Sequence, residues 1–203
     1  MEFGKNELIS MLFYLGYLTI TGEFFGKPEL KIPNNVMKEI YSNYFLNILK
    51  QETNLTVEQN EYNEMLREIA LEGSIGKIVE LTEEYLNNLS NRDSIKFDEK
   101  YVKIIFYSIA MNLKIFRIKS EIEVNRKYID LLITPRDTDK GYKSVLIEFK
   151  YLKKEEENKL KEKQLEAKEQ LEQYTKLEEI SNIPDLRKYT IVTVLDKMYV
   201  EEI

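Results

Sequence analysis

Two apolar runs in the second half of the chain are interrupted by charged residues. The run at 129–133 contains Asp130, and the run at 145–147 leads directly into Glu148 and Lys150. Segments that are apolar on both faces are typical of buried strands. Burying an isolated ionised carboxylate is costly unless a partner compensates it. These three charged residues are therefore candidates for chemistry.

The spacing of the three residues suits a metal site. Because side chains alternate across a strand, Glu148 and Lys150 share one face, and Asp130 can join them if the two strands pair. Two carboxylates about 4 Å apart repel by roughly 4 kcal/mol at an effective dielectric constant of 20. An ammonium relieves part of this repulsion, and a hard cation relieves more while making a water reactive. The pattern predicts a site for Mg²⁺ or Mn²⁺, with a buried ion-pair cluster without chemistry as the alternative.

The order of Asp, a spacer and Glu-x-Lys resembles the motif of the PD-(D/E)XK nuclease superfamily. Ile129 stands where the proline of that motif would be. Residues 121–130 are similar to the E-x-x-x-x-G-R-x-D stretch of a subgroup found C-terminal to AAA-ATPase-like modules. Asn125 replaces the glycine of that stretch, and two residues rather than one separate Arg126 from Ile129.

Three further segments carry the same resemblance. Residues 167–174 resemble the A-x-x-Q-[IL]…Y helix of the subgroup, and residues 97–101 resemble its glutamate-bearing helix. Residues 12–36 resemble the segment that joins ATPase and nuclease in those proteins. The resemblance therefore implies a AAA-type ATPase as a partner, or an N-terminal ATPase module that has been lost.

The resemblance implies a metal-dependent endonuclease or exonuclease that hydrolyses phosphodiester bonds of nucleic acid, with DNA as the expected substrate. Asp130, Glu148 and the backbone carbonyl of Phe149 would bind the metal. Lys150 would orient or deprotonate the attacking water, or stabilise charge on the phosphate. Three more residues receive roles in the same way: Glu99 holds a metal-bound water, Gln170 reaches the site from the following helix, and Arg126 contacts a substrate phosphate.

Two other functions remain open. The first is a catalytically degenerate nuclease fold that serves as an interaction or regulatory module of an ATPase system, and the second is a protein-binding helical scaffold built on residues 1–95. The net charge of −6 favours a non-catalytic module. The joint presence of Asp, Glu, Lys and Gln at the motif positions favours an enzyme, because loss of catalysis would free these costly charges to change.

Composition narrows the chemistry. The chain has no cysteine and no histidine, which excludes disulfides, thiolate zinc sites and histidine-dependent catalysis. The net charge is −7 over residues 1–100 and +1 over residues 101–203, so charge alone gives no support to nucleic-acid binding. The apolar stretch at 8–20 is too short to span a membrane. No signal-peptide pattern accompanies it, and we expect a cytoplasmic protein, with a homodimer left open.

Apolar periodicity gives the expected elements. Helices are expected at 7–15, 36–48, 56–73, 75–89 and from Ser94 or Asp98 to 113, with short strands at 17–20 and 29–32. Strands at 115–123, 127–134 and 143–151 precede one long helix over 153–180, and a hairpin at 188–196 and 198–202 follows. The buried stripe of the long helix is expected to comprise Leu160, Ala167, Leu171, Tyr174 and Leu177.

This order of helix, three strands, helix and strand predicts an α/β fold. By resemblance it is a restriction-endonuclease-like core, a mixed central sheet flanked by helices, with an N-terminal, mostly helical appendage. The polar run at 91–94 places the boundary. We expect an N-terminal support or linker region over 1–93 and a nuclease-like domain over 94–203.

Overall fold

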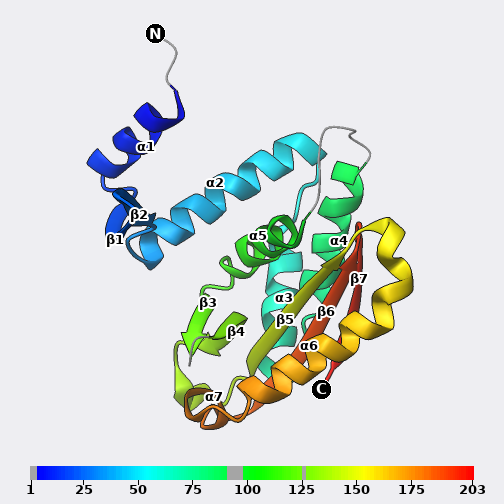
Figure 1. Cartoon of the computed structure of the whole chain (residues 1–203). Helices are drawn as coiled ribbons and strands as arrows, with labels where there is room; N and C mark the ends of the chain where they lie inside the picture. Colours follow the sequence, from blue (N-terminus) through cyan, green and yellow to red (C-terminus); the bar gives the residue numbers. More distant parts are fainter. Residues whose placement is uncertain (1–3, 91–97, 125–126) are drawn as a thin grey trace. The chain divides into compact units, whose positions relative to one another are not determined.

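The computed structural model describes residues 4–90, 98–124 and 127–203 (Figure 1). The elements are α1 (Lys5–Tyr14), β1 (Thr19–Phe24), β2 (Lys27–Lys31), α2 (Asn35–Thr53), α3 (Gln59–Glu72), α4 (Gly76–Ser90), α5 (Glu99–Ala110), β3 (Phe116–Val124), β4 (Lys127–Pro135), η1 (Thr138–Lys140), β5 (Ser144–Leu152), η2 (Lys154–Lys159), α6 (Leu160–Tyr174), α7 (Glu178–Ser181), β6 (Leu186–Val194) and β7 (Lys197–Glu202). Among the described residues, no helix has both the length and the apolar character needed to cross a bilayer.

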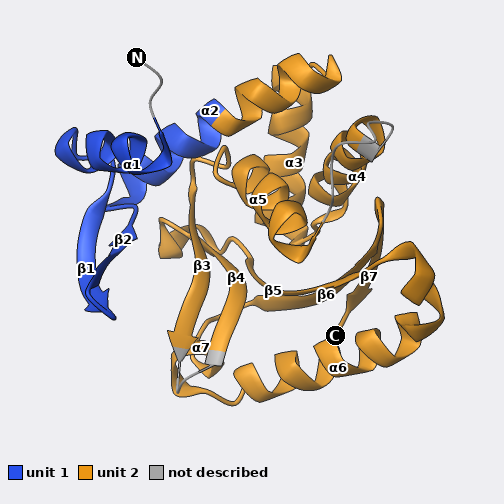
Figure 2. Cartoon of the chain, turned by 45° about the horizontal axis from the view of Figure 1, so that its top comes forward, with its two compact units in different colours: residues 1–44 blue, residues 45–203 orange. Residues whose placement is uncertain are grey.

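Two compact units make up the chain, residues 1–44 and 45–203 (Figure 2). The polar run at 91–94, where the sequence placed the boundary, lies outside the described residues. The division between the units falls earlier because α3 and α4 share one buried cluster with α5 and the sheet. Those two helices form part of the core of the larger unit.

The smaller unit contains α1 and a hairpin of β1 and β2. The loop of the hairpin has two residues, Phe25 and Gly26, which both have positive φ values of 48° and 74°. Positive φ at both loop residues is the geometry that matches the twist of paired strands. Because the turn takes up only these two residues, strand pairing continues to Phe24 and Lys27. The strands are longer than the segments expected at 17–20 and 29–32.

The larger unit is built on a five-stranded sheet in the order β3-β4-β5-β6-β7. β5 and β6 are parallel, and the other neighbours are antiparallel. Parallel neighbours need a crossover, and α6 belongs to the one between β5 and β6. Figure 2 shows α3, α4 and α5 on one face of the sheet and α6 on the other. The predicted α/β fold class, a mixed sheet flanked by helices, is confirmed.

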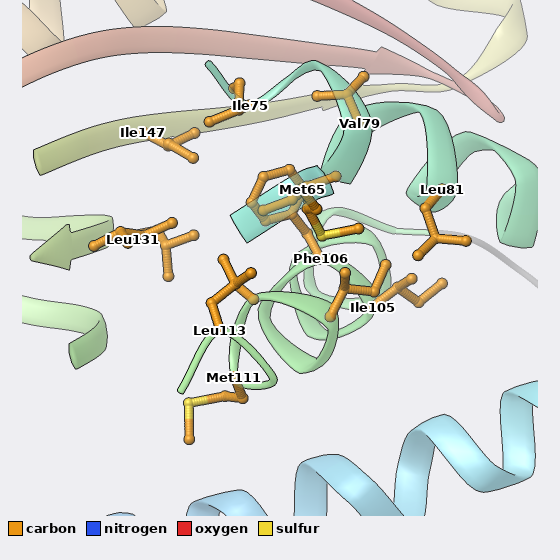
Figure 3. Close-up of a cluster of buried hydrophobic side chains, with 14 of the residues drawn as sticks. Met65, Ile75, Val79, Leu81, Ile105, Phe106, Met111, Leu113, Leu131 and Ile147 are labelled. Carbon is orange, nitrogen blue, oxygen red and sulfur yellow. The ribbon is translucent and has the colours of Figure 1, made fainter. Parts of the chain in front are cut away.

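The main core lies between the sheet and the helices α3, α4 and α5. Figure 3 shows its centre, where Met65, Phe106 and Leu113 lie near Leu131 and Ile147 of the sheet. These five side chains are at most 2% exposed. Fully burying an apolar side chain of this size stabilises a fold by about 1.5–3 kcal/mol. This packing fixes α5 against β4 and β5, the two strands that carry the charged motif.

The single helix predicted over 153–180 is wrong. Residues 154–159 form a 3₁₀ turn, α6 covers 160–174, and the chain is extended at Leu177 before α7. The break lets Ile180 join Leu171 and Tyr174 in a second buried cluster. A straight helix would place Ile180 beyond that cluster. Of the expected stripe, the buried members are Ala167, Leu171 and Tyr174, and the partly buried members are Leu160 and Leu177.

Candidate functional site

The start of α5 is set by a side-chain cap. The carboxylate of Asp98 accepts a hydrogen bond from the N–H of Tyr101 at 2.8 Å, which satisfies one of the free donors at the helix N-terminus. Ser94, the other predicted cap, lies outside the described residues. With the helix starting at Glu99, the side chain of Lys103 follows one turn later on the same side.

Asp130 lies where β4 and β5 stop pairing. The last paired residues are Leu131 and Ile147, and Asp130 is the next residue of β4. Its Oδ2 accepts the backbone N–H of Phe149 at 2.8 Å, so a side chain replaces the backbone acceptor at this point. In a strand, the N–H and C=O of one residue point to the same neighbour. The carbonyl of Phe149 therefore also faces the gap beside Asp130.

A backbone irregularity accompanies this gap. Leu131 packs in the main core, whereas Ile129 packs in the cluster beneath α6, although strict alternation would place both on one face. The break in alternation falls on Asp130. Across the ladder with β3, Glu121 is skipped between two paired positions and has a φ of 51°, in the left-handed region. Asp130 therefore points along the sheet toward β5.

The first charged group of the site joins α5 to β4. The Nζ of Lys103 donates to Oε1 of Glu99 and to Oδ1 of Asp130, both at 2.6 Å. Burial lowers the pKa of Lys103, but hydrogen bonds and charge from Asp130 and Glu99 outweigh it, so the net shift of that pKa is upward. Sequence reasoning missed Lys103. The acid-base pair at i and i+4 on α5 was the only local signal for it.

The second charged group joins β5 to α6. The Nζ of Lys150 donates to Oε1 of Glu148 at 2.8 Å and to Oε1 of Gln170 at 2.6 Å. Glu148 is only 3% exposed. These three side chains meet because Glu148 and Lys150 share the face of β5 that α6 covers.

Glu148 is incompletely neutralised. Its Oε2 is buried and has no hydrogen-bond partner among the described residues. Burial first, and then the charge of Asp130, raise the pKa of Glu148 to about 7 against the opposing effects of Lys150 and Lys103. A buried carboxylate with one free oxygen and a second carboxylate nearby is a favourable place for another cation.

Tyr174 closes the α6 side of the site. Its hydroxyl donates to the backbone carbonyl of Tyr128 at 3.0 Å. Burial, followed by the negative charges of Glu148 and Asp130, raises the pKa of Tyr174 to about 12. This tyrosine is therefore a neutral hydrogen-bond donor that ties α6 to β4.

A hollow of about 410 Å³ opens beside Asp130 on the α5 side. It is lined by Glu99, Lys100, Lys103, Ile104, Tyr107, Ser120, Glu121, Asp130, Leu131 and Phe149. Its charged lining comprises three carboxylates and two lysines, and the aromatic and aliphatic members form its apolar part. The hollow gives access from solvent to the carboxylate of Asp130.

The structure brings most of the predicted site residues together. Glu148, Lys150 and Gln170 are joined by hydrogen bonds, and Asp130 and Glu99 are joined through Lys103. The two groups are near enough for the charge of Asp130 to raise the pKa of Glu148. Arg126 lies outside the described residues. Within the described residues, no three acidic side chains group closely enough to bind a metal by themselves. The donors that suit a hard cation are two carboxylates and the Phe149 carbonyl, an oxygen set of the kind that Mg²⁺ accepts with several waters.

A comparison with protein-family models decides the family. The model of the PD-(D/E)XK nuclease superfamily matches residues 97–202, just over half of the chain. The chain belongs to the PD-(D/E)XK nuclease superfamily. The matched segment includes α5 and all five strands of the sheet, so the fold is restriction-endonuclease-like. Family membership indicates a nuclease-like function, and nucleases of this superfamily typically use divalent metals. A comparison with curated proteins gave no match.

Proposed function

We propose that this PD-(D/E)XK protein is a metal-dependent nuclease that hydrolyses phosphodiester bonds of nucleic acid. The observation that carries the proposal is the buried Oε2 of Glu148, which has no hydrogen-bond partner in the described parts of the chain and feels the negative charge of Asp130. A buried carboxylate oxygen without a partner lowers the stability of the fold, and a bound cation would offset that cost. Oxygen donors of this kind favour Mg²⁺ or Mn²⁺ over softer metals.

When bound, a divalent ion would polarise a phosphoryl oxygen of the substrate and make a bound water more acidic. Asp130 and Glu148 are the proposed ligands, together with the carbonyl of Phe149. Lys150 uses two of its three N–H donors on Glu148 and Gln170. Its third donor would serve the attacking water or the phosphate, where positive charge stabilises the developing negative charge.

The remaining residues have supporting roles in this proposal. Gln170 holds the ammonium of Lys150 from α6 at 2.6 Å, which makes it a positioning residue. Glu99 acts on the site through Lys103 and supports a water of the metal. Arg126 contacts a substrate phosphate in line with its place in the sequence motif.

We further propose DNA as the substrate and a AAA-type ATPase as the partner, in the cytoplasm. The resemblance of residues 12–36 to an ATPase-nuclease joining segment supports the partner. In the smaller unit, three aromatic residues are largely solvent-exposed: Tyr14 at 85%, Phe24 at 63% and Phe25 at 89%. Exposed aromatic residues in one small unit favour a protein-binding role for it.

A second candidate function is supported by a specific observation. Lys103 and Lys150 each contact one of the two carboxylates, so the site holds two cations of its own. A degenerate nuclease fold that serves as a regulatory or interaction module would have this arrangement and no need for a metal. It would bind its partner equally well when Lys150 is replaced by Ala.

A cleavage assay separates the two functions. Purified wild type, Glu148→Gln and Lys150→Ala are incubated with labelled single- and double-stranded DNA and RNA in Mg²⁺ or Mn²⁺. Lys153→Ala, an exposed lysine at the end of β5, serves as the control. We expect cleavage by wild type and by the control and its loss in both site variants. Absence of cleavage by wild type on every substrate favours the regulatory module.

A further inference from the structure

Lys103 contacts the proposed metal ligand directly. Its Nζ lies 2.6 Å from Oδ1 of Asp130, and the other oxygen of Asp130 accepts the N–H of Phe149 at 2.8 Å. Both oxygens of this carboxylate therefore have partners, and one partner is a cation that belongs to the chain. The side chain of Asp130 is 11% exposed and that of Lys103 is 23% exposed, so water screens the pair only partly.

A divalent ion at Asp130 would need the position that the ammonium holds. Mg²⁺ binds a carboxylate oxygen at about 2.0–2.1 Å, and two cations on one oxygen would repel strongly in a partly buried site. We propose that Lys103 is a tethered cation that occupies Asp130 in the absence of a divalent ion and leaves Asp130 when the ion binds. This inference rests on Asp130 being a metal ligand in the proposed function.

Glu99 provides a place for the displaced ammonium. It lies four residues before Lys103 on α5 and already accepts its Nζ at 2.6 Å. Glu99 is 40% exposed, and both residues line the hollow beside Asp130. Lys103 can therefore move away from Asp130 into the hollow while its ion pair with Glu99 persists. The exchange breaks one ion pair rather than two, which keeps the barrier to metal entry low.

This arrangement makes Lys103 a residue that sets metal affinity. The metal must compete with an ammonium of the same chain. Pairing of this ammonium with Asp130 costs no entropy of association, because the chain already holds the two groups close together. Removal of the ammonium should raise the affinity of the site for Mn²⁺ by about tenfold or more, a change equivalent to about 1.4 kcal/mol per factor of ten. If Lys103 only helped to build the site, its removal would weaken Mn²⁺ binding.

Calorimetric titration of the full chain with Mn²⁺ tests the inference. The variants are Lys103→Met, Asp130→Asn and the control Lys100→Met, which removes a lysine from the same helix and the same hollow. We expect tighter binding by Lys103→Met, unchanged binding by Lys100→Met and loss of binding by Asp130→Asn. If Lys103→Met binds Mn²⁺ equally or more weakly than wild type and Asp130→Asn does not bind it, Lys103 does not compete with the ion. The proposed metal site is then still supported. Absence of Mn²⁺ binding in all four proteins overturns both.

Thermal unfolding gives an independent result if Lys103→Met does not fold. Lys103→Gln keeps a hydrogen-bond donor without the charge. In EDTA this variant should melt below wild type, because Asp130 loses its cation. In saturating Mn²⁺ the difference should shrink, because the ion takes over the role of the ammonium. A difference of the same size in EDTA and in Mn²⁺ overturns the inference.

Discussion

The buried carboxylate of Glu148 should make the free energy of unfolding depend on pH in the absence of metal. Its pKa is raised from 4.5 to about 7 in the folded protein. Between these two values the folded state binds a proton that the unfolded state has released, so stability falls as pH rises from about 4.5 to about 7. Glu148→Gln removes this proton equilibrium. The variant should therefore match wild type below about pH 4 and exceed it above about pH 7.

The size of the effect follows from the shift in pKa. A shift of one unit corresponds to about 1.36 kcal/mol. The shift from 4.5 to about 7 therefore corresponds to about 3 kcal/mol in favour of the variant at high pH. Because Glu148 is only 3% exposed, solvent screens this effect only weakly.

Urea denaturation in EDTA measures this effect at several pH values. Glu162→Gln, an exposed glutamate on α6, is the matched control and should follow wild type throughout. The opposite result would be a Glu148→Gln variant that is less stable than wild type by several kcal/mol at every pH. That result would show that the ionised carboxylate serves mainly as the structural partner of Lys150.

Three further predictions concern catalysis and the strand irregularity. Lys150→Ala should bind Mn²⁺ at least as tightly as wild type in calorimetry, because Lys150 leaves one oxygen of Glu148 free for the ion, and it should lose a factor of roughly 10² to 10⁴ in cleavage rate, the range of a positioned acid-base group; equal rates would exclude Lys150 from the reaction. Ca²⁺ should bind in the same titration but support little cleavage, because it accepts looser geometry and acidifies water less than Mg²⁺; full activity in Ca²⁺ would contradict the proposed use of the metal. Glu121→Gly should be neutral or stabilising by up to about 1 kcal/mol in urea denaturation, because a φ of 51° costs a side-chain residue about 1–2 kcal/mol. Glu121→Val should be destabilising, and the opposite order of the two variants would show that the left-handed conformation is not retained.

The sequence was sufficient where buried residues repeat with a regular period. The inward face of α5, with Val102, Ile105, Phe106 and Ile109, follows from spacings of three and four residues, and all four residues are buried. The pairing of Glu148 and Lys150 on one face follows from alternation along β5. Both inferences need only the geometry of one element.

Features that depend on contacts between elements could not be predicted in this way. Lys103 reaches Asp130 across 27 positions of the chain, and its contact depends on where α5 crosses β4. No glycine marks the left-handed residue at Glu121, so the local irregularity that turns Asp130 toward β5 has no sequence signal. The break before Leu177 was hidden by a charged, helix-favouring composition and is set by the packing of Ile180.

The proposed nuclease activity requires that Asp130 and Glu148 bind one divalent ion together. Crystals of the protein soaked in Mn²⁺ test it through anomalous difference density. We expect one peak at about 2.0–2.3 Å from an oxygen of each carboxylate, with the Nζ of Lys103 displaced from Asp130 toward Glu99. A site that lacks the peak while Lys103 remains on Asp130 would contradict the claim.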